Sequence, residues 1–296
     1  MEDQFLNKIK QEFPKLNISH HKIIDKGWDY ILININNKYL FRFPRDKKYP
    51  KEHILIEMLL LKELNKISNI KLPNYEFISK NKDFGGYKII NGKEFNLRIF
   101  KNLNNKKRVE IAKQLANFLS ILHNFPLNKA KELGFKKPDW HWNIKKGVKE
   151  FMKRKETIFS AHLSEKEKWF IENYYKELLS LSILKKTVLL HGDISSDHIL
   201  FNKNKIVGII DFGDSNLGDP AVDFAYFWFL DKDFVSLVYK YYSGPKDKKF
   251  ILRSECYSYQ SIMNRLYHGV KEKNKELLNG AFKDLRKSMK EGFHTK

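Results

Sequence analysis

Two aspartates, Asp193 and Asp211, stand at positions that suit phosphoryl transfer. Asp193 comes shortly after the apolar run Val188–Leu190, and Asp211 directly follows the apolar run Ile206–Ile210. A strand, a turn-rich loop and a second strand pair would deliver both carboxylates to one rim of a small sheet. Phosphoryl transfer needs one carboxylate to orient and deprotonate the attacking hydroxyl, and another to hold the magnesium that bridges the phosphates. The pattern therefore predicts a catalytic pair of carboxylates.

The string HGDISSDHILFNKNKIVGIIDFGD, residues 191–214, resembles the catalytic and metal-binding motifs of the protein-kinase-like fold. It is most similar to the form found in the aminoglycoside phosphotransferase family. The resemblance implies that Asp193 is the catalytic aspartate and Asp211 the magnesium-binding aspartate. It also implies that His198 stands where protein kinases carry a metal-binding Asn. We therefore expect Mg²⁺ as cofactor and ATP or GTP as co-substrate.

The next segment, GDPAVDFAY at residues 218–226, also resembles that family. We interpret Asp219 and Asp223 as structural, because an aspartate ahead of a helix caps exposed amides and favours the positive end of the helix dipole. An isolated HxD or DFG occurs by chance in many chains. Here the order, spacing and strand context of the motifs together favour the kinase-like fold over coincidence.

The region before these motifs resembles the small lobe of a kinase. Strands are expected at residues 22–26, 30–34, 39–43, 77–78 and 86–90, with a turn at Asn36-Asn37 and a helix over residues 51–66. In the resembling family, the backbone of the hinge that follows meets the nucleotide base, which implies that role for Ile90 and Gly92. We predict an α+β, two-lobed fold with an antiparallel-sheet nucleotide lobe at residues 1–92 and a mainly helical catalytic and substrate-binding lobe at residues 93–296.

The third expected strand, YLFRFPR, carries Arg42 where the resembling family usually has a phosphate-binding lysine that pairs with a glutamate on the next helix. Glu57 is the matching partner. Arginine can bind phosphate and carboxylate through a planar fork, so the pair can be retained. Together with the turn at Gly27-Trp28, the strand also resembles macrolide phosphotransferases. The alternative is that Arg42 is a surface cation with its stem packed on the sheet.

Later segments predict helices that would wall an acceptor pocket. Their expected ranges are residues 108–123, 149–158, 164–179, 250–271 and 275–289, with a near capping box from Ser164 to Glu167. His123, at the end of the first of these helices, is interpreted as a satisfied core or cap histidine in preference to a catalytic base.

The acceptor is less clearly encoded. An enzyme for polycationic aminoglycosides should line its pocket with carboxylates. The candidate acids are Glu255, Asp231, Asp233, Asp197 and Asp214, whereas Asn264 and Arg265 stand where an acid is expected. An apolar wall for a macrolide-like ring is the alternative role for Trp140, Trp142, Tyr257, Tyr259 and Tyr267, unless they belong to the core. An aminoglycoside-type antibiotic is therefore the leading acceptor, and a macrolide or other metabolite the alternative.

The composition is that of a protein able to bury a substantial core, since 42% of the 296 residues are hydrophobic and 14% aromatic. Its single cysteine, Cys256, excludes an internal disulfide framework and is typical of a reducing compartment. The N-terminus carries acids and amphipathic spacing in place of a signal peptide, and no apolar run approaches the ~20 residues of a membrane span. We expect a cytoplasmic, monomeric resistance enzyme.

The net charge of +21, from 56 Lys and Arg against 35 Asp and Glu, would attract nucleic acid or anionic membranes non-specifically. The basic residues are nevertheless spread over the whole chain, without an aromatic stacking pattern. We therefore expect no specific nucleic-acid or membrane partner. A catalytically silent kinase-like binding module is the alternative of another class, and the presence of both Asp193 and Asp211 speaks against it.

Overall fold

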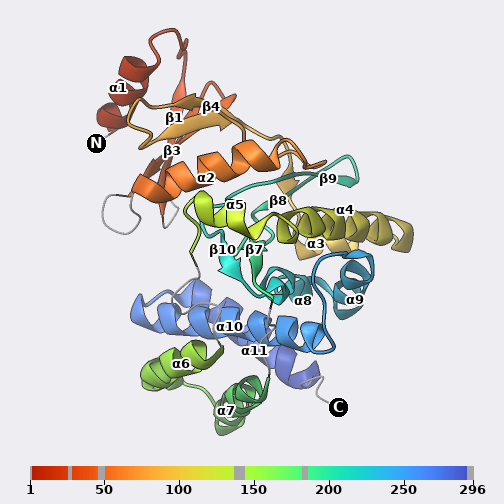
Figure 1. The fold of residues 1–296 in the computed structure, drawn as a ribbon. Coiled ribbons are helices and arrows are strands. Elements are labelled where there is room, and N and C mark those ends of the chain that lie inside the picture. The colour runs from red at the N-terminus through yellow and green to blue at the C-terminus, as the bar shows by residue number, and fades with distance from the viewer. Residues whose placement is uncertain (1, 26–28, 46–50, 137–143, 182–185, 292–296) are drawn as a thin grey trace. The chain divides into compact units, whose positions relative to one another are not determined.

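The computed structural model describes residues 2–25, 29–45, 51–136, 144–181 and 186–291 (Figure 1). The chain forms two compact units, each built from three segments. The first unit contains Met1–Phe95, Pro126–Phe135 and Ser195–Ser215, and the second contains Asn96–Phe125, Lys136–Ile194 and Asn216–Lys296. Each compact unit combines segments from before and after residue 92 or from several parts of the chain, so no single boundary divides them. The predicted division into lobes at residue 92 stays a prediction.

An antiparallel five-stranded sheet dominates the first unit, with the strand order β1-β2-β3-β5-β4. Asn36 and Asn37 connect the second strand to the third with φ values of 55° and 52°. Two successive left-handed residues are what a tight hairpin requires, and asparagine tolerates that conformation. The expected strands of this sheet are confirmed; they are β1 (His21–Ile24), β2 (Tyr30–Ile35), β3 (Tyr39–Pro44), β4 (Tyr75–Ile78) and β5 (Gly85–Lys88).

Helices α1 (Glu2–Glu12) and α2 (Lys51–Leu64) cover opposite faces of this sheet (Figure 1). The alternation of strand side chains explains the arrangement. In β2, Ile31 and its alternate neighbours pack with α1, whereas Tyr30 packs with Ile54 and Met58 of α2. In β3, Phe41 and Phe43 join the α1 side. The residue between these two phenylalanines, Arg42, therefore points to the face covered by α2.

A second sheet in the first unit has the order β6-β8-β9, with antiparallel pairing. Its strands are β6 (Lys93–Glu94), β8 (Ile199–Asn202) and β9 (Lys205–Ile209), and α5 (Leu127–Glu132) joins the same unit through an ion pair between Lys129 and Glu63 of α2.

The strand before Asp193 does not belong to that sheet. β7 (Val188–Leu190) pairs with β10 (Asn216–Gly218) in a separate two-stranded sheet of the second unit. The prediction that one small sheet carries Asp193 and Asp211 on a common rim is therefore wrong. The physical reason is that β8 already pairs with β6 on one side and β9 on the other. The chain after Asp211 instead turns back to give β7 its partner.

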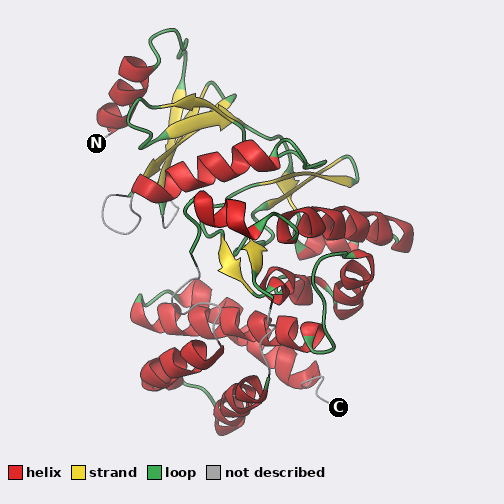
Figure 2. Cartoon of the chain, in the orientation of Figure 1, coloured by secondary structure: helices red, strands yellow, loops and turns green. Residues whose placement is uncertain are grey.

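Helices make up most of the described part of the second unit (Figure 2). The five predicted helices are present, with α7 beginning after a complete capping box between Ser164 and Glu167. The helices are α3 (Leu97–Lys101), α4 (Asn105–His123), α6 (Ile144–Phe159), α7 (Glu165–Ser180), η1 (Pro220–Phe224), α8 (Phe227–Leu230), α9 (Lys232–Tyr241), α10 (Phe250–Lys271) and α11 (Lys275–Glu291). Across the described ranges, no helix combines the length and the apolar character that crossing a membrane requires.

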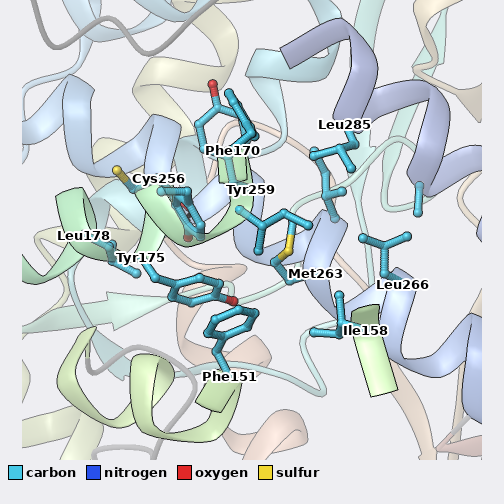
Figure 3. Close-up of a cluster of buried hydrophobic side chains, with 14 of the residues drawn as sticks. Phe151, Ile158, Phe170, Tyr175, Leu178, Cys256, Tyr259, Met263, Leu266 and Leu285 are labelled. Carbon is cyan, nitrogen blue, oxygen red and sulfur yellow. Dashed lines mark hydrogen bonds between the residues drawn. The ribbon is translucent and has the colours of Figure 1, made fainter. Parts of the chain in front are cut away.

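Four of these helices, α6, α7, α10 and α11, share a hydrophobic core (Figure 3). The rings of Phe151 and Tyr175 stack with centroids 3.6 Å apart, and Met263 and Leu285 extend the cluster. Cys256 lies in the same cluster as a buried free thiol. Close packing of aromatic and aliphatic side chains at this density fixes the mutual positions of the helices.

Candidate active site

Arg42 and Glu57 form a buried ion pair in the first unit. The guanidinium Nη1 donates to Glu57 Oε1 at 2.6 Å, and the two residues are only 2% and 1% exposed. The alternation along β3 points Arg42 at α2, where Glu57 lies one turn from Ile54. The interpretation of Arg42 as a surface cation is therefore wrong. The predicted pairing with Glu57 is present.

Arg42 also reaches Asp211, which lies 169 positions later in the chain. The second guanidinium nitrogen, Nη2, donates to Asp211 Oδ1 at 2.8 Å. In contrast to Glu57, the Asp211 side chain is 43% exposed. Its backbone has a φ of 64°, a left-handed conformation that costs free energy for a residue with a Cβ. The ion pair with Arg42 helps to hold Asp211 in this conformation, directly after Ile210.

Tyrosines complete the surroundings of the ion pair, and one of them, Tyr87 of β5, interacts with Arg42 through its side chain. The Tyr30 ring lies under the guanidinium, with its centroid 3.9 Å from Arg42 Cζ. The Tyr75 hydroxyl donates to Glu57 Oε1 at 3.2 Å. Burial raises the pKa of both Tyr30 and Tyr75 above the ordinary value, so both phenols stay protonated.

Some polar atoms of the ion pair make no hydrogen bond within the part of the chain that the structure describes. Arg42 Nε and Glu57 Oε2 are buried and have no hydrogen-bond partner among the described residues. Burial raises the pKa of Glu57 to about 7, against the opposing effect of the Arg42 charge. A buried ion pair with unsatisfied atoms is costly to maintain, so such atoms at a site call for a functional explanation.

His198 lies beside Asp211 in the first unit. Its Nε2 is 3.5 Å from Asp211 Oδ2, and its Nδ1 is 3.4 Å from Ser195 Oγ. The backbone N–H of Ile210 donates to the His198 carbonyl at 3.0 Å, which ties the loop before β8 to the end of β9. Asp211 is thus flanked by a guanidinium on one oxygen and an imidazole on the other.

The donor set suits a magnesium ion that arrives with a nucleotide. Within the described ranges, no group of three or more His, Cys, Asp or Glu side chains is arranged to hold a metal ion alone. Magnesium in phosphoryl-transfer sites is usually bound by one or two carboxylates together with the substrate phosphates. The half-exposed carboxylate of Asp211 fits that mode, and the metal-binding roles of Asp211 and His198 stay predictions.

Ile90 and Gly92 belong to the segment between β5 and β6, which has no regular secondary structure, in line with the predicted hinge. The next two residues, Lys93 and Glu94, form β6. Ile90 is held against β9 by Gly208, where a Cβ would lie 2.6 Å from Ile90 Cγ2. The contact of Ile90 and Gly92 with a nucleotide base stays a prediction.

Asp193 lies in the second unit, exposed on the loop that follows β7. The start of this loop is fixed by Asp223, whose carboxylate accepts the backbone N–H groups of His191 at 2.8 Å and Gly192 at 2.9 Å. Gly192 has a φ of 88°, which favours glycine. The loop is therefore anchored at the two residues that directly precede Asp193. The catalytic role of Asp193 stays a prediction.

Asp223 also pairs with His123. His123 Nε2 is 3.0 Å from Asp223 Oδ2, and His123 Nδ1 is 2.7 Å from the Tyr242 hydroxyl. The histidine is buried, which confirms it as a satisfied core residue. Burial by itself would raise the pKa of Asp223, but the hydrogen bonds from His123 and the Gly192 amide lower it overall. The expected structural role of Asp223 is present, although it fixes a loop where we had expected a helix cap.

Asp219 performs the capping role. It is the N-cap of η1, accepting from the Ala221 N–H at 3.1 Å, and it also binds the Arg253 guanidinium at 2.5 Å and the Tyr257 hydroxyl at 3.2 Å. Arg253, which is 1% exposed, was missed by sequence reasoning. The available signal was a cation directly after the apolar run Phe250–Leu252 at the start of α10. This network ties α10 to the segment that contains Asp223.

The candidate acceptor residues are used differently from what we expected. Asp231 caps α9, and Glu255 is buried with the Tyr259 hydroxyl as donor at 2.9 Å. Tyr257 and Tyr259 are buried, as the core alternative predicted. Arg265 pairs with Asp284. Asp233 is exposed in the second unit, Asp197 and Asp214 belong to the first unit, and Gly27, Trp28, Trp140 and Trp142 lie outside the described residues.

Comparison with known proteins identifies the class to which this fold belongs. The chain superimposes on the GDP complex of a mutant aminoglycoside 2′-phosphotransferase of type IIIa with a TM-score of 0.85, 23% identity and 99% coverage of both chains. The GDP and kanamycin complex of an aminoglycoside 2″-phosphotransferase gives a TM-score of 0.82 at 22% identity, covering 98% of this chain and 99% of that one. The predicted α+β, protein-kinase-like fold is confirmed.

A macrolide 2′-phosphotransferase from Brachybacterium faecium is also similar, with a TM-score of 0.66 and 13% identity over 94% of this chain and 96% of that one. In sequence, the aminoglycoside 3′-phosphotransferase of Escherichia coli is 34% identical over 65 residues, which is 22% of this chain and 24% of the relative. Residues 22–244 match the model of the phosphotransferase enzyme family. The chain belongs to that family.

Proposed function

We propose that this protein is a magnesium-dependent small-molecule kinase that transfers the γ-phosphate of ATP or GTP to a hydroxyl of an aminoglycoside-type antibiotic, and thereby confers resistance. The observation that carries the proposal is the buried pair of Arg42 and Glu57 continued to the half-exposed Asp211. A fixed cation beside a carboxylate that faces solvent is the arrangement that binds a metal-bridged triphosphate. Family membership supports the same chemistry.

On the nucleotide side, Arg42 would contact the phosphates while Glu57 fixes its position from within the unit. Asp211, with His198 beside it, would hold the metal, and Ile90 and Gly92 would meet the base. Magnesium, when bound, neutralises the charge that develops on the transferred phosphoryl group. The guanidinium needs no proton transfer in this role, because its pKa lies far above neutral pH.

On the acceptor side, Asp193 would orient the attacking hydroxyl and accept its proton. Its carboxylate is exposed to an incoming substrate, while the backbone before it is fixed through His191 and Gly192. A mobile base would pay the cost of ordering at each turnover, so a fixed loop favours catalysis.

Support for an aminoglycoside acceptor comes from the relatives, one of which was solved with kanamycin. The net charge of +21 favours the triphosphate and disfavours a polycation, so local carboxylates would have to bind the antibiotic. A macrolide or other metabolite is the second candidate, favoured by the similarity to a macrolide 2′-phosphotransferase and by the arginine at position 42.

The proposal includes a cytoplasmic monomer without a specific nucleic-acid or membrane partner. The buried free thiol of Cys256 supports a reducing compartment, where cysteines stay unpaired. ATP and GTP are both present there as co-substrates.

The test is consumption of ATP and GTP by the purified protein with and without magnesium, in the presence of aminoglycosides, macrolides or simple amino alcohols. We expect stimulation by an aminoglycoside. Asp193→Asn should lower kcat about 10²–10⁴-fold while the melting temperature and nucleotide affinity stay unchanged. Stimulation by a macrolide alone would select the second candidate. A protein that binds neither nucleotide would be a silent module, and the proposal would be wrong.

A further inference from the structure

We infer that Tyr30 is a positioning residue for Arg42, and that its ring fixes the plane of the guanidinium that binds the nucleotide phosphates. The inference rests on the proposed function and deepens it. It concerns a residue that the motifs did not identify, in a chain that carries arginine where lysine is usual. The residue would act through Arg42 and would not itself touch the substrate.

The geometry places the ring where it can control the guanidinium. Tyr30 and Arg42 lie on neighbouring strands, with Leu32 of β2 directly opposite Arg42 in the register. Tyr30 is therefore the diagonal neighbour on the same face, a distance that aromatic side chains can span. The ring centroid is 3.9 Å from Arg42 Cζ, and Tyr30 is 5% exposed. A desolvated contact of this kind is the strong form of the cation–π interaction.

The hydrogen bonds of Arg42 leave a freedom that the ring removes. Nη1 is bound to Glu57 and Nη2 to Asp211, so both bonds leave from one end of the fork, and the Tyr87 side chain of β5 also interacts with the guanidinium. Nε, at the other end, has no hydrogen-bond partner among the described residues. Two hydrogen bonds from the Nη atoms still let the plane tilt about the line that joins their acceptors, Glu57 Oε1 and Asp211 Oδ1. The face of Tyr30 supplies that constraint.

The dependence should be specific to arginine. A guanidinium binds carboxylate and phosphate in its plane, so its tilt decides which oxygens it reaches. A lysine ammonium is a point charge with three rotatable donors and has no plane to fix. Loss of the Tyr30 ring should therefore matter when residue 42 is arginine and matter little when it is lysine.

The ring, and not the hydroxyl, should carry the effect. Tyr30 Oη is buried without a hydrogen-bond partner among the described residues. Tyr75 differs, because its hydroxyl donates to Glu57. Phenylalanine at position 30 should therefore serve as well as tyrosine, whereas an aliphatic side chain should not.

The experiment measures the Kd of ATP with magnesium, the kcat and the melting temperature for five variants of the full chain. They are Tyr30→Leu, Tyr30→Phe, Arg42→Lys, the double variant Tyr30→Leu with Arg42→Lys, and the control Tyr39→Leu. Tyr39 is a partly buried tyrosine of the same sheet that packs on Phe77, on the face away from Arg42. The control therefore removes a tyrosine ring of the same lobe without touching the ion pair.

We expect Tyr30→Leu to weaken the affinity for ATP about tenfold, with a smaller change in kcat, and Tyr30→Phe to stay within about twofold of the wild type. In the Arg42→Lys background, Tyr30→Leu should add less than about twofold. Equal losses in Tyr30→Leu and Tyr39→Leu, or the same tenfold loss in both backgrounds, would overturn the inference.

A second measurement separates this inference from the proposed function. Side-chain ¹⁵N NMR of Arg42, on the protein without added nucleotide, reports rotation of the guanidinium group. Slow rotation is expected in the wild type and Tyr30→Phe, and fast averaging in Tyr30→Leu. If the wild type binds neither ATP nor GTP, the proposed function fails. The NMR result then decides the positioning role alone, and identical rotation in all three proteins would refute it.

Discussion

Two of the buried charged clusters in the described part of the chain differ in how completely they are hydrogen-bonded. In the first unit, the Arg42 cluster leaves the guanidinium Nε and one oxygen of Glu57 without partners among the described residues. In the second unit, the Asp223 carboxylate accepts from two backbone amides and pairs with His123, whose other nitrogen meets Tyr242. The first cluster ends at a half-exposed carboxylate, whereas the second is enclosed.

The difference indicates that one cluster serves ligand binding and the other serves the stability of the fold. A fully satisfied buried network holds one arrangement, because any change would leave a polar group unpaired. A partly satisfied one gains partners when a charged ligand arrives. We therefore expect substitutions in the Arg42 cluster to act on nucleotide binding, and substitutions in the Asp223 cluster to act on stability and on the loop that carries Asp193.

Asp211→Asn should have the largest effect of the proposed substitutions, and this effect should be on ATP binding. A loss of stability instead would contradict the contrast between the two clusters. We expect magnesium-dependent binding of ATP to weaken on the order of 100-fold or more, because the amide lacks the charge that binds the metal. The free energy of unfolding should change little, since the side chain is 43% exposed and Arg42 keeps Glu57. Calorimetric titration and urea unfolding measure the two quantities. Asp197→Asn, an exposed acid of the same unit, is the matched control.

Asp223→Asn should lower the stability of the protein and leave ATP binding unchanged. The amide would leave one of the backbone N–H groups of His191 and Gly192 without an acceptor, and it removes the charge opposite His123. We expect a loss of about 3 kcal/mol in the free energy of unfolding and a lower kcat, with the ATP affinity retained. Urea unfolding with parallel kinetics checks this. The control is Asp233→Asn, and a variant as stable as this control would contradict the assigned role.

The pH dependence of stability should also distinguish the two clusters, because one contribution is lost as the pH falls and the other as the pH rises. This is the smallest of the three expected effects. The folded pKa of Asp223 lies below its ordinary value of 3.8. Its contribution is therefore present above pH 3.8 and is lost as the pH falls through the lower folded pKa. The folded pKa of Glu57 is raised from 4.5 to about 7, so its contribution is present below pH 4.5 and lost as the pH rises through 7.

Urea midpoints measured between pH 3 and pH 8 test both signs. The stability difference between wild type and Asp223→Asn should shrink below about pH 4, and Glu57→Gln should gain on the wild type as the pH passes about 7. A pH-independent difference for either variant would refute the corresponding assignment.

The sequence predicted local elements better than long-range pairing. The alternation of β2 and β3, the Asn36-Asn37 turn and the capping box at Ser164 depend on neighbouring residues, and each is present. The partners of β7 and the ring under Arg42 depend on residues that no short-range period connects. That is why both carboxylates were wrongly assigned to one sheet.

The candidate site shows the same division. Arg42 and Glu57 are 15 positions apart on adjacent elements, and their pairing was predicted through the resemblance to the family, which pairs a cation on this strand with a glutamate on the next helix. Arg42 and Asp211 are 169 positions apart, and Asp219 and Arg253 are 34 apart across a region of short helices. Nothing in the periodicity of either segment indicates these contacts.

The three-segment construction of the first unit bears on how the chain is made. Residues 1–95 leave the ribosome first. The sheet that contains β6 also needs β8 and β9, which are translated much later. Asp211 can reach Arg42 only after residues 96–125 and 136–194 of the second unit have been translated. The nucleotide-binding unit is therefore finished late in synthesis, and a fragment that ends at residue 95 would present an unpaired β6 edge and a buried arginine with one of its two carboxylates missing.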